Sequence, residues 1–281
     1  MYKKFSIICA TLDDTDIIRN FIDSIEKSFL SASHDLFRCE IIIIDQSTYR
    51  RKFGFKSKVK NVEIIYIHSK KRGLSFNRNI GLKIASGDYF LVFDSDCTLD
   101  INFFDKAFQI LNKFSYFDLF FYPILSVEYK TPIFRHWPNE IIDISKCRRF
   151  YYATSVNIMW RKNKIPHFYD EDFGLGSYFP SCEDIDFALR FNCKSIFIPE
   201  IKVFHPYQDN YSNGIYKLVN YSFGFGALCR KHIFPVGLII LLLSLFKKIL
   251  DTLFGNSPIQ YLVPVLYSRL KGFFHYKRVS V

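Results

Sequence analysis

The sequence predicts an α/β protein with a mostly parallel central sheet flanked by helices, and two observations support this. Short apolar, β-branched segments alternate with segments whose apolar residues recur at helical spacing. Such alternation is typical of βαβ units, in which crossover helices cover both faces of a parallel sheet. The chain has 281 residues and is 49% hydrophobic, which is ample for a buried core with or without an appended segment.

The first hundred residues follow this alternation. The predicted order is strand 5–10, a helix containing Ile17 to Ile25, strand 40–45, strand 62–67, helix 74–85 and strand 89–93. Ligands of such sheets collect at the carboxyl ends of the strands, where loops leave for the helices. Asp13, Asp45 and Asp94 fall at these ends.

The next hundred residues are less regular, and we expect mixed strand pairing there. The predicted elements are helix 102–114, strands 119–127 and 151–160, helix 182–191 and strand 195–203. Residues from 211 onward change to helical character, with helices over 215–231 and 259–276 and an uncharged run at 233–246 between them.

The run at 233–246 has only fourteen residues and contains Pro235 and Gly237. A membrane-spanning helix needs about 20 residues, so the run favours an interfacial or re-entrant helix over a span. The alternative is a helix buried against the body of the protein.

Charge and cysteine usage indicate a compartment and a class of partner. Residues 217–281 hold nine Lys and Arg against Asp251 alone, in a chain of net charge +11. This basic, aromatic-rich extension suggests an anionic partner: lipid headgroups, nucleic acid or a phosphorylated acceptor. The N-terminus shows no secretory signal, and seven cysteines without a CxxC pair favour reduced thiols. We therefore expect a cytoplasmic protein, peripheral at the inner face of the cell membrane.

The segment Tyr89-Phe-Leu-Val-Phe-Asp94-Ser95-Asp96 carries the most chemical information. It is an apolar strand that ends in two aspartates, which strand periodicity points to one side. Two neighbouring carboxylates repel each other unless a cation or donor groups join them. Mg²⁺ or Mn²⁺ fits such oxygen ligands and could stabilise a nucleoside diphosphate as a leaving group.

Five segments in order make the signal more specific: Ser6–Thr11, Glu40–Ser47, Arg72–Gly81, Ala85–Tyr89 and Phe93–Asp96. Together they resemble the ordered signatures of family 2 glycosyltransferases, and the similarity resumes at Tyr169–Gly176 and Ser181–Arg190. The resemblance implies a GT-A fold, which is the nucleotide-diphospho-sugar transferase fold. It also implies an inverting enzyme of the polysaccharide-biosynthesis type.

The resemblance assigns roles by position. Thr11 and Asp45 would contact the nucleoside, with Asp45 accepting from the base, and Arg78 would hold the nucleotide. Ser95 lies within the same nucleotide-sugar site, where Asp94 would reach the ribose or the metal, and Asp96 would be the principal metal ligand. The alternatives are a capped turn for Thr11 and a surface salt bridge for Arg78.

The resemblance also points to a general base. Asp184 of the Glu183-Asp184 pair is expected to take the proton of the acceptor hydroxyl. Glu183 and Asp186 are expected to orient the acceptor or the helix, although acids are also favoured at a helix N-terminus for their charge alone. Cys182 stands where the family commonly has glycine. His205 follows a predicted strand where family members often carry a histidine near the diphosphate or metal, and its alternative role is structural.

These features divide the chain into a catalytic domain over 1–210 and a basic helical extension over 211–281. Within the domain, 1–105 is the expected nucleotide-sugar-binding half and 106–210 the acceptor half. The expected function is sugar transfer from a nucleoside diphosphate sugar to a glycan or lipid-linked hydroxyl in cell-surface polysaccharide synthesis, with no nucleic-acid partner. The alternatives are a non-catalytic sugar-nucleotide-binding or membrane-binding scaffold and, with less support, a sugar nucleotidyltransferase. The last would carry a glycine-rich, basic loop after the first strand, and residues 10–20 contain no glycine.

Overall fold

The computed structural model describes residues 3–12, 15–32, 37–51, 55–162, 168–207 and 214–276. These residues form two compact units. The first unit comprises residues up to Tyr169 together with Phe187–Tyr207, and the second comprises Asp170–Asp186 together with the chain from Gln208 onward. Asp13, at the end of the first predicted strand, lies outside the described residues.

An eight-stranded sheet forms the centre of the first unit. Its strands are β1 (Lys3–Thr11), β2 (Phe37–Asp45), β3 (Val62–His68), β4 (Tyr89–Phe93), β6 (Leu119–Phe121), β8 (Ile142–Ile144), β9 (Ile158–Arg161) and β10 (Ser195–Phe197). They lie in the order β3-β2-β1-β4-β9-β6-β10-β8. Pairing is parallel from β3 to β4, and β9 pairs antiparallel with β4 and β6. The mostly parallel sheet with mixed pairing in its second half is confirmed.

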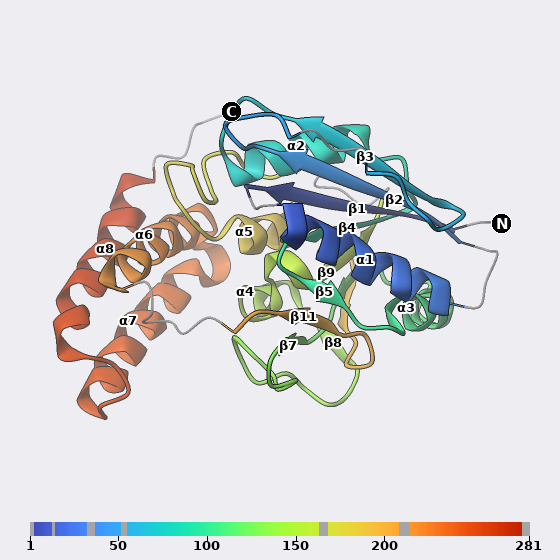
Figure 1. Cartoon of the computed structure of the whole chain (residues 1–281). Helices are drawn as coiled ribbons and strands as arrows, with labels where there is room; N and C mark the ends of the chain where they lie inside the picture. The colour runs from blue at the N-terminus through green and yellow to red at the C-terminus, as the bar shows by residue number, and fades with distance from the viewer. Residues whose placement is uncertain are drawn as a thin grey trace. The chain divides into compact units, whose positions relative to one another are not determined.

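Helices cover the parallel half of this sheet on both faces. α2 (Leu74–Ile84) lies on one face, while α1 (Thr15–Ser31) and α3 (Phe103–Lys113) lie on the other (Figure 1). Right-handed crossovers explain why α1 and α2 lie on opposite faces, since the chain moves in opposite directions across the sheet from β1 to β2 and from β3 to β4. All five residues of β4 are buried, so the core fixes the position of the residues that follow the C-terminal end of this central strand.

A smaller three-stranded sheet contains β5 (Thr98–Leu99), β7 (Ile124–Ser126) and β11 (Val203–His205). Two predicted strands are therefore wrong in extent. The chain at 119–127 divides into β6 and β7, and the chain at 195–203 divides into β10 and β11, each pair shared between the two sheets. Pro123 and Pro199 lie in the connections, and proline has no N–H to continue a strand ladder.

The predicted strand over 151–160 is also wrong in its first half. The structure has a short helix, α4 (Arg149–Tyr152), and a 3₁₀ turn at Ser155–Asn157 before β9. The backbone N–H of Thr154 donates to Asn157 Oδ1 at 2.9 Å. This side-chain hydrogen bond stabilises the turn in place of a strand ladder.

The second unit contains three long helices, α6 (Gly214–Lys231), α7 (Leu238–Leu253) and α8 (Leu262–His275). α6 and α8 cross at van der Waals distance, because a Cβ at Gly226 would lie 1.9 Å from the carbonyl oxygen of Arg269. A Cβ at Gly272 would lie equally close, at 1.9 Å, to the carbonyl oxygen of Phe223. Both positions therefore require glycine for backbone contact rather than for an unusual φ.

The apolar run at 233–246 begins with a π-helical turn at Ile233–Gly237 and continues into α7. Among the described residues, no helix combines the length and the apolarity needed to cross a membrane. Helix α5 (Glu183–Arg190) belongs to both units, since its first turn is part of the second unit and its remainder is part of the first.

Candidate active site

The carboxyl ends of β1, β2 and β4 bring together the predicted nucleotide residues of the first unit. Thr11 ends β1 beside Asp45 at the end of β2, and their Cα atoms are register partners. The hydroxyls of Thr11 and Ser95 lie 2.9 Å apart, and both side chains are buried. Thr11 is the last residue of β1, and its hydroxyl lies within hydrogen-bond distance of the loop after β4.

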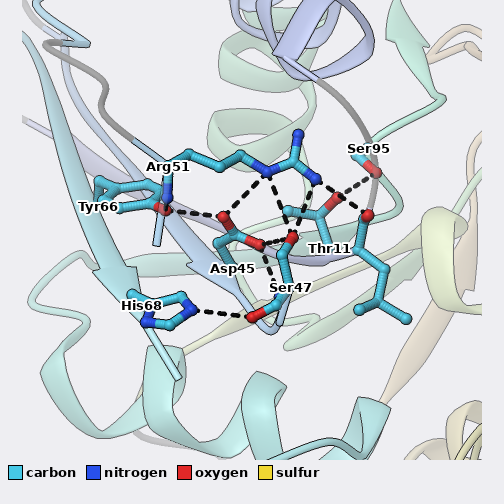
Figure 2. Close-up of polar contacts among 8 residues, drawn as sticks. Thr11, Asp45, Ser47, Arg51, Tyr66, His68 and Ser95 are labelled. Atoms are coloured by element: carbon cyan, nitrogen blue, oxygen red, sulfur yellow. Dashed lines mark hydrogen bonds and ion pairs between the residues drawn. The ribbon is translucent and has the colours of Figure 1, made fainter. Parts of the chain in front are cut away.

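Asp45 is the centre of a dense polar cluster (Figure 2). Its carboxylate is fully buried and accepts hydrogen bonds from the backbone N–H of Ser47 at 2.9 Å, from the Ser47 hydroxyl, and from the Tyr66 hydroxyl at 2.7 Å. Arg51 Nε lies 3.2 Å from Asp45 Oδ2. A base that donates to Asp45 would therefore have to displace one of these donors.

Arg51 and Tyr66 were not singled out from the sequence. The Arg51 guanidinium is fixed by the carbonyl oxygen of Leu12 at 3.1 Å and by the Ser47 hydroxyl at 2.9 Å (Figure 2). Burial and the hydrogen bond to Asp45 raise the pKa of Tyr66 to about 12, so its hydroxyl remains a donor at neutral pH. The available signal is a tyrosine that interrupts the isoleucines of β3.

Arg78 forms a buried ion pair with Asp94. Its Nη2 donates to Asp94 Oδ1 at 2.8 Å, and the Ser155 hydroxyl donates to Asp94 Oδ2 at 3.2 Å. The Arg78 side chain is fully buried, with its guanidinium 5.4 Å from the ring centroid of Tyr169. The ion pair expected as an alternative exists, but it is not a surface pair. Because the Asp94 side chain is 35% exposed, the guanidinium fixes a carboxylate that still reaches solvent.

Asp96 and His205 are brought together from the loop after β4 and from the end of β11. His205 Nε2 lies 3.6 Å from Asp96 Oδ1. His205 Nδ1 lies 2.8 Å from the carbonyl oxygen of Pro206, which can only accept. In the neutral imidazole the proton is therefore on Nδ1, and the Nε2 lone pair points towards Asp96. This is the arrangement in which histidine ligates a metal.

The donor set at this point fits a divalent cation. Ligand atoms of Asp96, Cys97 and His205 lie within 4.8 Å of one another. Burial and the neighbouring carboxylates raise the pKa of the Cys97 thiol well above its usual value, so the sulfur stays protonated. Mg²⁺ and Mn²⁺ prefer oxygen ligands, and Mn²⁺ also accepts imidazole. The residues that could hold such an ion are Asp96 and His205, with Asp94 nearby in sequence.

The predicted base lies in the second unit, at the start of α5. Asp184 is half-buried, and its Oδ1 accepts from the N–H of Ile185 at 2.8 Å. Cys182, immediately before the helix, has φ of 68°, the left-handed region that normally selects glycine. The backbone geometry expected of a glycine is therefore retained with a cysteine in its place.

Asp186 is held by two basic side chains. Its Oδ1 lies 2.7 Å from Lys231 Nζ and 2.9 Å from His232 Nε2, and the side chain is fully buried. Lys231 also pairs with Asp170 at 2.5 Å. Asp186 thus joins the end of α6 to the loop that starts at Asp170, and it is not available to a substrate. Glu183 is buried as well, which leaves Asp184 as the accessible acid of the three.

The model of the family described as glycosyl transferase family 2 matches residues 6–172. The chain belongs to glycosyl transferase family 2. The match spans β1 to the start of the Asp170 loop and therefore includes Thr11, Asp45, Arg78, Asp94 and Asp96. The protein is accordingly a glycosyltransferase, as the ordered segments predict.

Solved structures confirm the fold. Residues 1–349 of TarS from S. aureus align with a TM-score of 0.54 at 17% identity, covering 98% of this chain and 73% of that one. The complex of the same TarS fragment with UDP-GlcNAc aligns with a TM-score of 0.55 at 16% identity, covering 98% of this chain and 74% of that one. A search of curated proteins found no match. At this identity the likeness establishes a shared GT-A fold.

Proposed function

We propose that this glycosyltransferase transfers a sugar from a nucleoside diphosphate sugar to a hydroxyl group of a glycan or lipid-linked acceptor during cell-surface polysaccharide synthesis. The observation that carries the proposal is the convergence of three polar pairs at the carboxyl ends of β1, β4 and β11. These are Thr11 with Ser95, Arg78 with Asp94, and Asp96 with His205. Residues 1–105 remain the proposed donor half and 106–210 the proposed acceptor half, with 211–281 as an extension.

On the donor side, Thr11 and Ser95 offer hydroxyls to the nucleoside, and Asp45 is the proposed acceptor for the base. Arg78 orients Asp94 towards the ribose or the cation. Asp96 and His205 are the proposed ligands of Mn²⁺ or Mg²⁺, with Asp94 as a further ligand. When bound, the cation would neutralise the diphosphate as it departs. The similar fold crystallised with UDP-GlcNAc supports a uridine nucleotide as the first donor to test.

On the acceptor side, Asp184 is the proposed general base. A hydroxyl is a poor nucleophile until a carboxylate within hydrogen-bond reach takes its proton during attack. Attack opposite to the departing diphosphate inverts the anomeric centre. Asp186, Lys231 and His232 position the helix that carries Asp184 rather than taking part in proton transfer.

We also propose that α7 and α8 rest on an anionic membrane surface. α7 exposes Leu238, Ile239, Leu242, Leu243, Phe246, Ile249 and Leu253, which lie on one face at helical spacing. α8 exposes a second stripe of Val263, Tyr267, Leu270 and Phe274. Lys247 and Lys271 adjoin these stripes, and the extension from residue 217 contains a single acid, so headgroup attraction would act with apolar burial. In this proposal the enzyme acts at the inner face of the cell membrane.

Thermal shift with UDP-GlcNAc, UDP-glucose and UDP-galactose, with and without Mn²⁺, tests the donor proposal. A ligand that binds the native state raises its melting temperature, and a metal-dependent rise for at least one nucleotide sugar is expected. Release of UDP on prolonged incubation then reports turnover in water. If no nucleotide sugar shifts the melting temperature in either condition, the donor proposal is wrong.

A further inference from the structure

An open pocket of about 540 Å³ lies in the second unit, and none of its lining residues belongs to the polar pairs of the donor site. Two segments form it: the loop that begins at Asp170, and the C-terminal end of α8. The lining residues are Asp172, Tyr178, Phe179, Phe274, His275 and Tyr276. The volume is within the range of about 300–1,000 Å³ that is usual for small-ligand sites.

Aromatic side chains build the floor and the rim. Phe179 is buried, with its ring centroid 5.8 Å from that of Tyr276 and 5.2 Å from that of Phe223. Tyr178 and Phe274 line the same pocket but are 63% and 75% exposed. Both aromatic side chains are therefore accessible to a ligand in the pocket.

The loop that forms one wall is rigidly closed. The N–H of Phe179 donates to the carbonyl oxygen of Asp172 at 2.8 Å, and the N–H of Gly174 donates to the carbonyl oxygen of Phe179 at 2.9 Å. Gly174 and Gly176 have φ of 106° and 84°, which only glycine adopts readily. The wall is therefore pre-organised, and little conformational entropy would be lost when a ligand binds.

Polar groups are interspersed with these rings. The Asp172 carboxylate is exposed at the pocket and can accept two hydroxyl hydrogen bonds. His275 Nδ1 lies 2.9 Å from the carbonyl oxygen of Lys271, so in the neutral imidazole Nδ1 carries the proton and Nε2 is an acceptor. An acyl chain would leave these polar groups without partners, whereas a sugar ring satisfies both kinds of surface. Its C–H face packs on aromatic rings, and its hydroxyls bond to carboxylate, imidazole and phenol.

We propose that this pocket binds a pyranose unit of the acceptor glycan. The inference rests on the proposed function and names the part of the chain that recognises the acceptor. The loop that supplies Tyr178 continues directly into the turn at Cys182 and the predicted base Asp184, within the same unit. Phe274 belongs both to the pocket and to the exposed stripe of α8, so a lipid-linked glycan at a membrane surface would present its sugars here.

Saturation-transfer NMR on the full chain tests the pocket with chitotriose, maltotriose, cellotriose and xylotriose as probes at millimolar concentration. We expect transfer to the C–H protons of at least one trisaccharide. In Tyr178→Ala and in Phe274→Ala, the affinity for that trisaccharide should fall roughly tenfold, the effect of losing one aromatic platform. Tyr267→Ala is the matched control, because Tyr267 is 65% exposed in the same stripe of α8 but does not line the pocket.

Nucleotide-sugar thermal shift on the same variants separates this inference from the donor proposal. Both pocket variants should keep the metal-dependent donor shift of the unaltered chain, which also shows that they fold. The pocket proposal is overturned if no saturation transfer reaches any of the four trisaccharides, or if Tyr267→Ala loses as much trisaccharide affinity as the pocket variants. Either result leaves the donor proposal intact. Dodecylphosphocholine micelles are the probe for a lipid. If the micelles bind at Tyr178 and prevent binding of the trisaccharides, the pocket is a lipid site and the inference is overturned.

Discussion

Gly224→Ala tests whether α6 fixes the backbone that leads to the predicted base. Gly224 is interior to α6, and a Cβ there would lie 2.2 Å from Ser181 Oγ, 3.0 Å from Ser181 O and 3.1 Å from Ser181 N. Ser181 immediately precedes the left-handed Cys182, and its hydroxyl is held by the carbonyl oxygen of Tyr221 at 3.1 Å. The hydroxyl therefore cannot rotate away without losing a hydrogen bond, and the backbone atoms behind it are also close.

The sign of the stability change in Gly224→Ala shows whether helix propensity or the close contact with Ser181 dominates. In an open helix interior, replacing glycine with alanine stabilises by about 1 kcal/mol. Overpacking a close contact costs about 1–3 kcal/mol, so the net change expected at Gly224 is a loss of stability of up to about 2 kcal/mol. In a chain of this size each kcal/mol of lost stability lowers the melting temperature by about 2–4 °C. Turnover should fall further, because the turn before Asp184 must move.

Differential scanning calorimetry with urea unfolding measures the stability, and UDP release from the donor measures turnover. Ser181→Ala in the Gly224→Ala background removes the atom at 2.2 Å, so the double variant should recover about 1 kcal/mol relative to additivity. Gly226→Ala should destabilise the protein more than Gly224→Ala, because its Cβ would clash with a backbone carbonyl oxygen that no side-chain substitution can remove. A Gly224→Ala protein that is more stable than the unaltered chain would refute the reasoning.

Further predictions concern the cation, the base, the strained turn and the membrane surface. Asp96→Asn should weaken Mn²⁺ binding at least tenfold by isothermal titration calorimetry, since a charged ligand is lost; unchanged affinity would place the cation elsewhere. Asp184→Asn should keep the donor thermal shift but lose UDP release by about 10²–10⁴-fold, and normal turnover would assign the base to another group. Cys182→Gly should retain activity, whereas Cys182→Val should lower stability by about 1–2 kcal/mol because a β-branched residue is poorly tolerated at positive φ. Equal melting temperatures for Cys182→Val and the unaltered chain would contradict the left-handed turn. The wild-type protein should float with vesicles that contain anionic phosphatidylglycerol and should float less with neutral vesicles, whereas Leu243→Glu should abolish flotation of the full chain. If light scattering shows oligomers and the wild-type protein does not float, the apolar stripe is a self-association surface instead.

The parallel half of the fold could be predicted closely because each element has a clear period. β1, β2 and β4 are mainly apolar runs, as expected of strands buried on both faces. Periodicity could not divide 119–127 or 195–203, because residues in either sheet are equally apolar and equally buried. The sheet that each segment joins is decided by long-range pairing, which a local pattern does not contain.

The candidate site shows the same limit. Asp94 and Asp96 could be selected because two acids at the end of an apolar strand are conspicuous, and His205 could be selected from the resemblance to the family. Arg51 could not be selected, because its contact with Asp45 depends on the path of the loop after β2 rather than on any spacing. Asp186 was expected to orient the acceptor or the helix, and only the structure shows that its carboxylate contacts Lys231 and His232 at the end of α6.

The backbone contact between α6 and α8 also constrains how this protein can diverge. Gly226 and Gly272 each face a carbonyl oxygen of the opposite helix, so a larger residue at one position cannot be accommodated by trimming the other. Relatives that keep this crossing should retain glycine at both positions even where the surrounding apolar residues vary freely. Loss of glycine at one of them would mark a lineage in which the two helices have separated and the extension has taken another form.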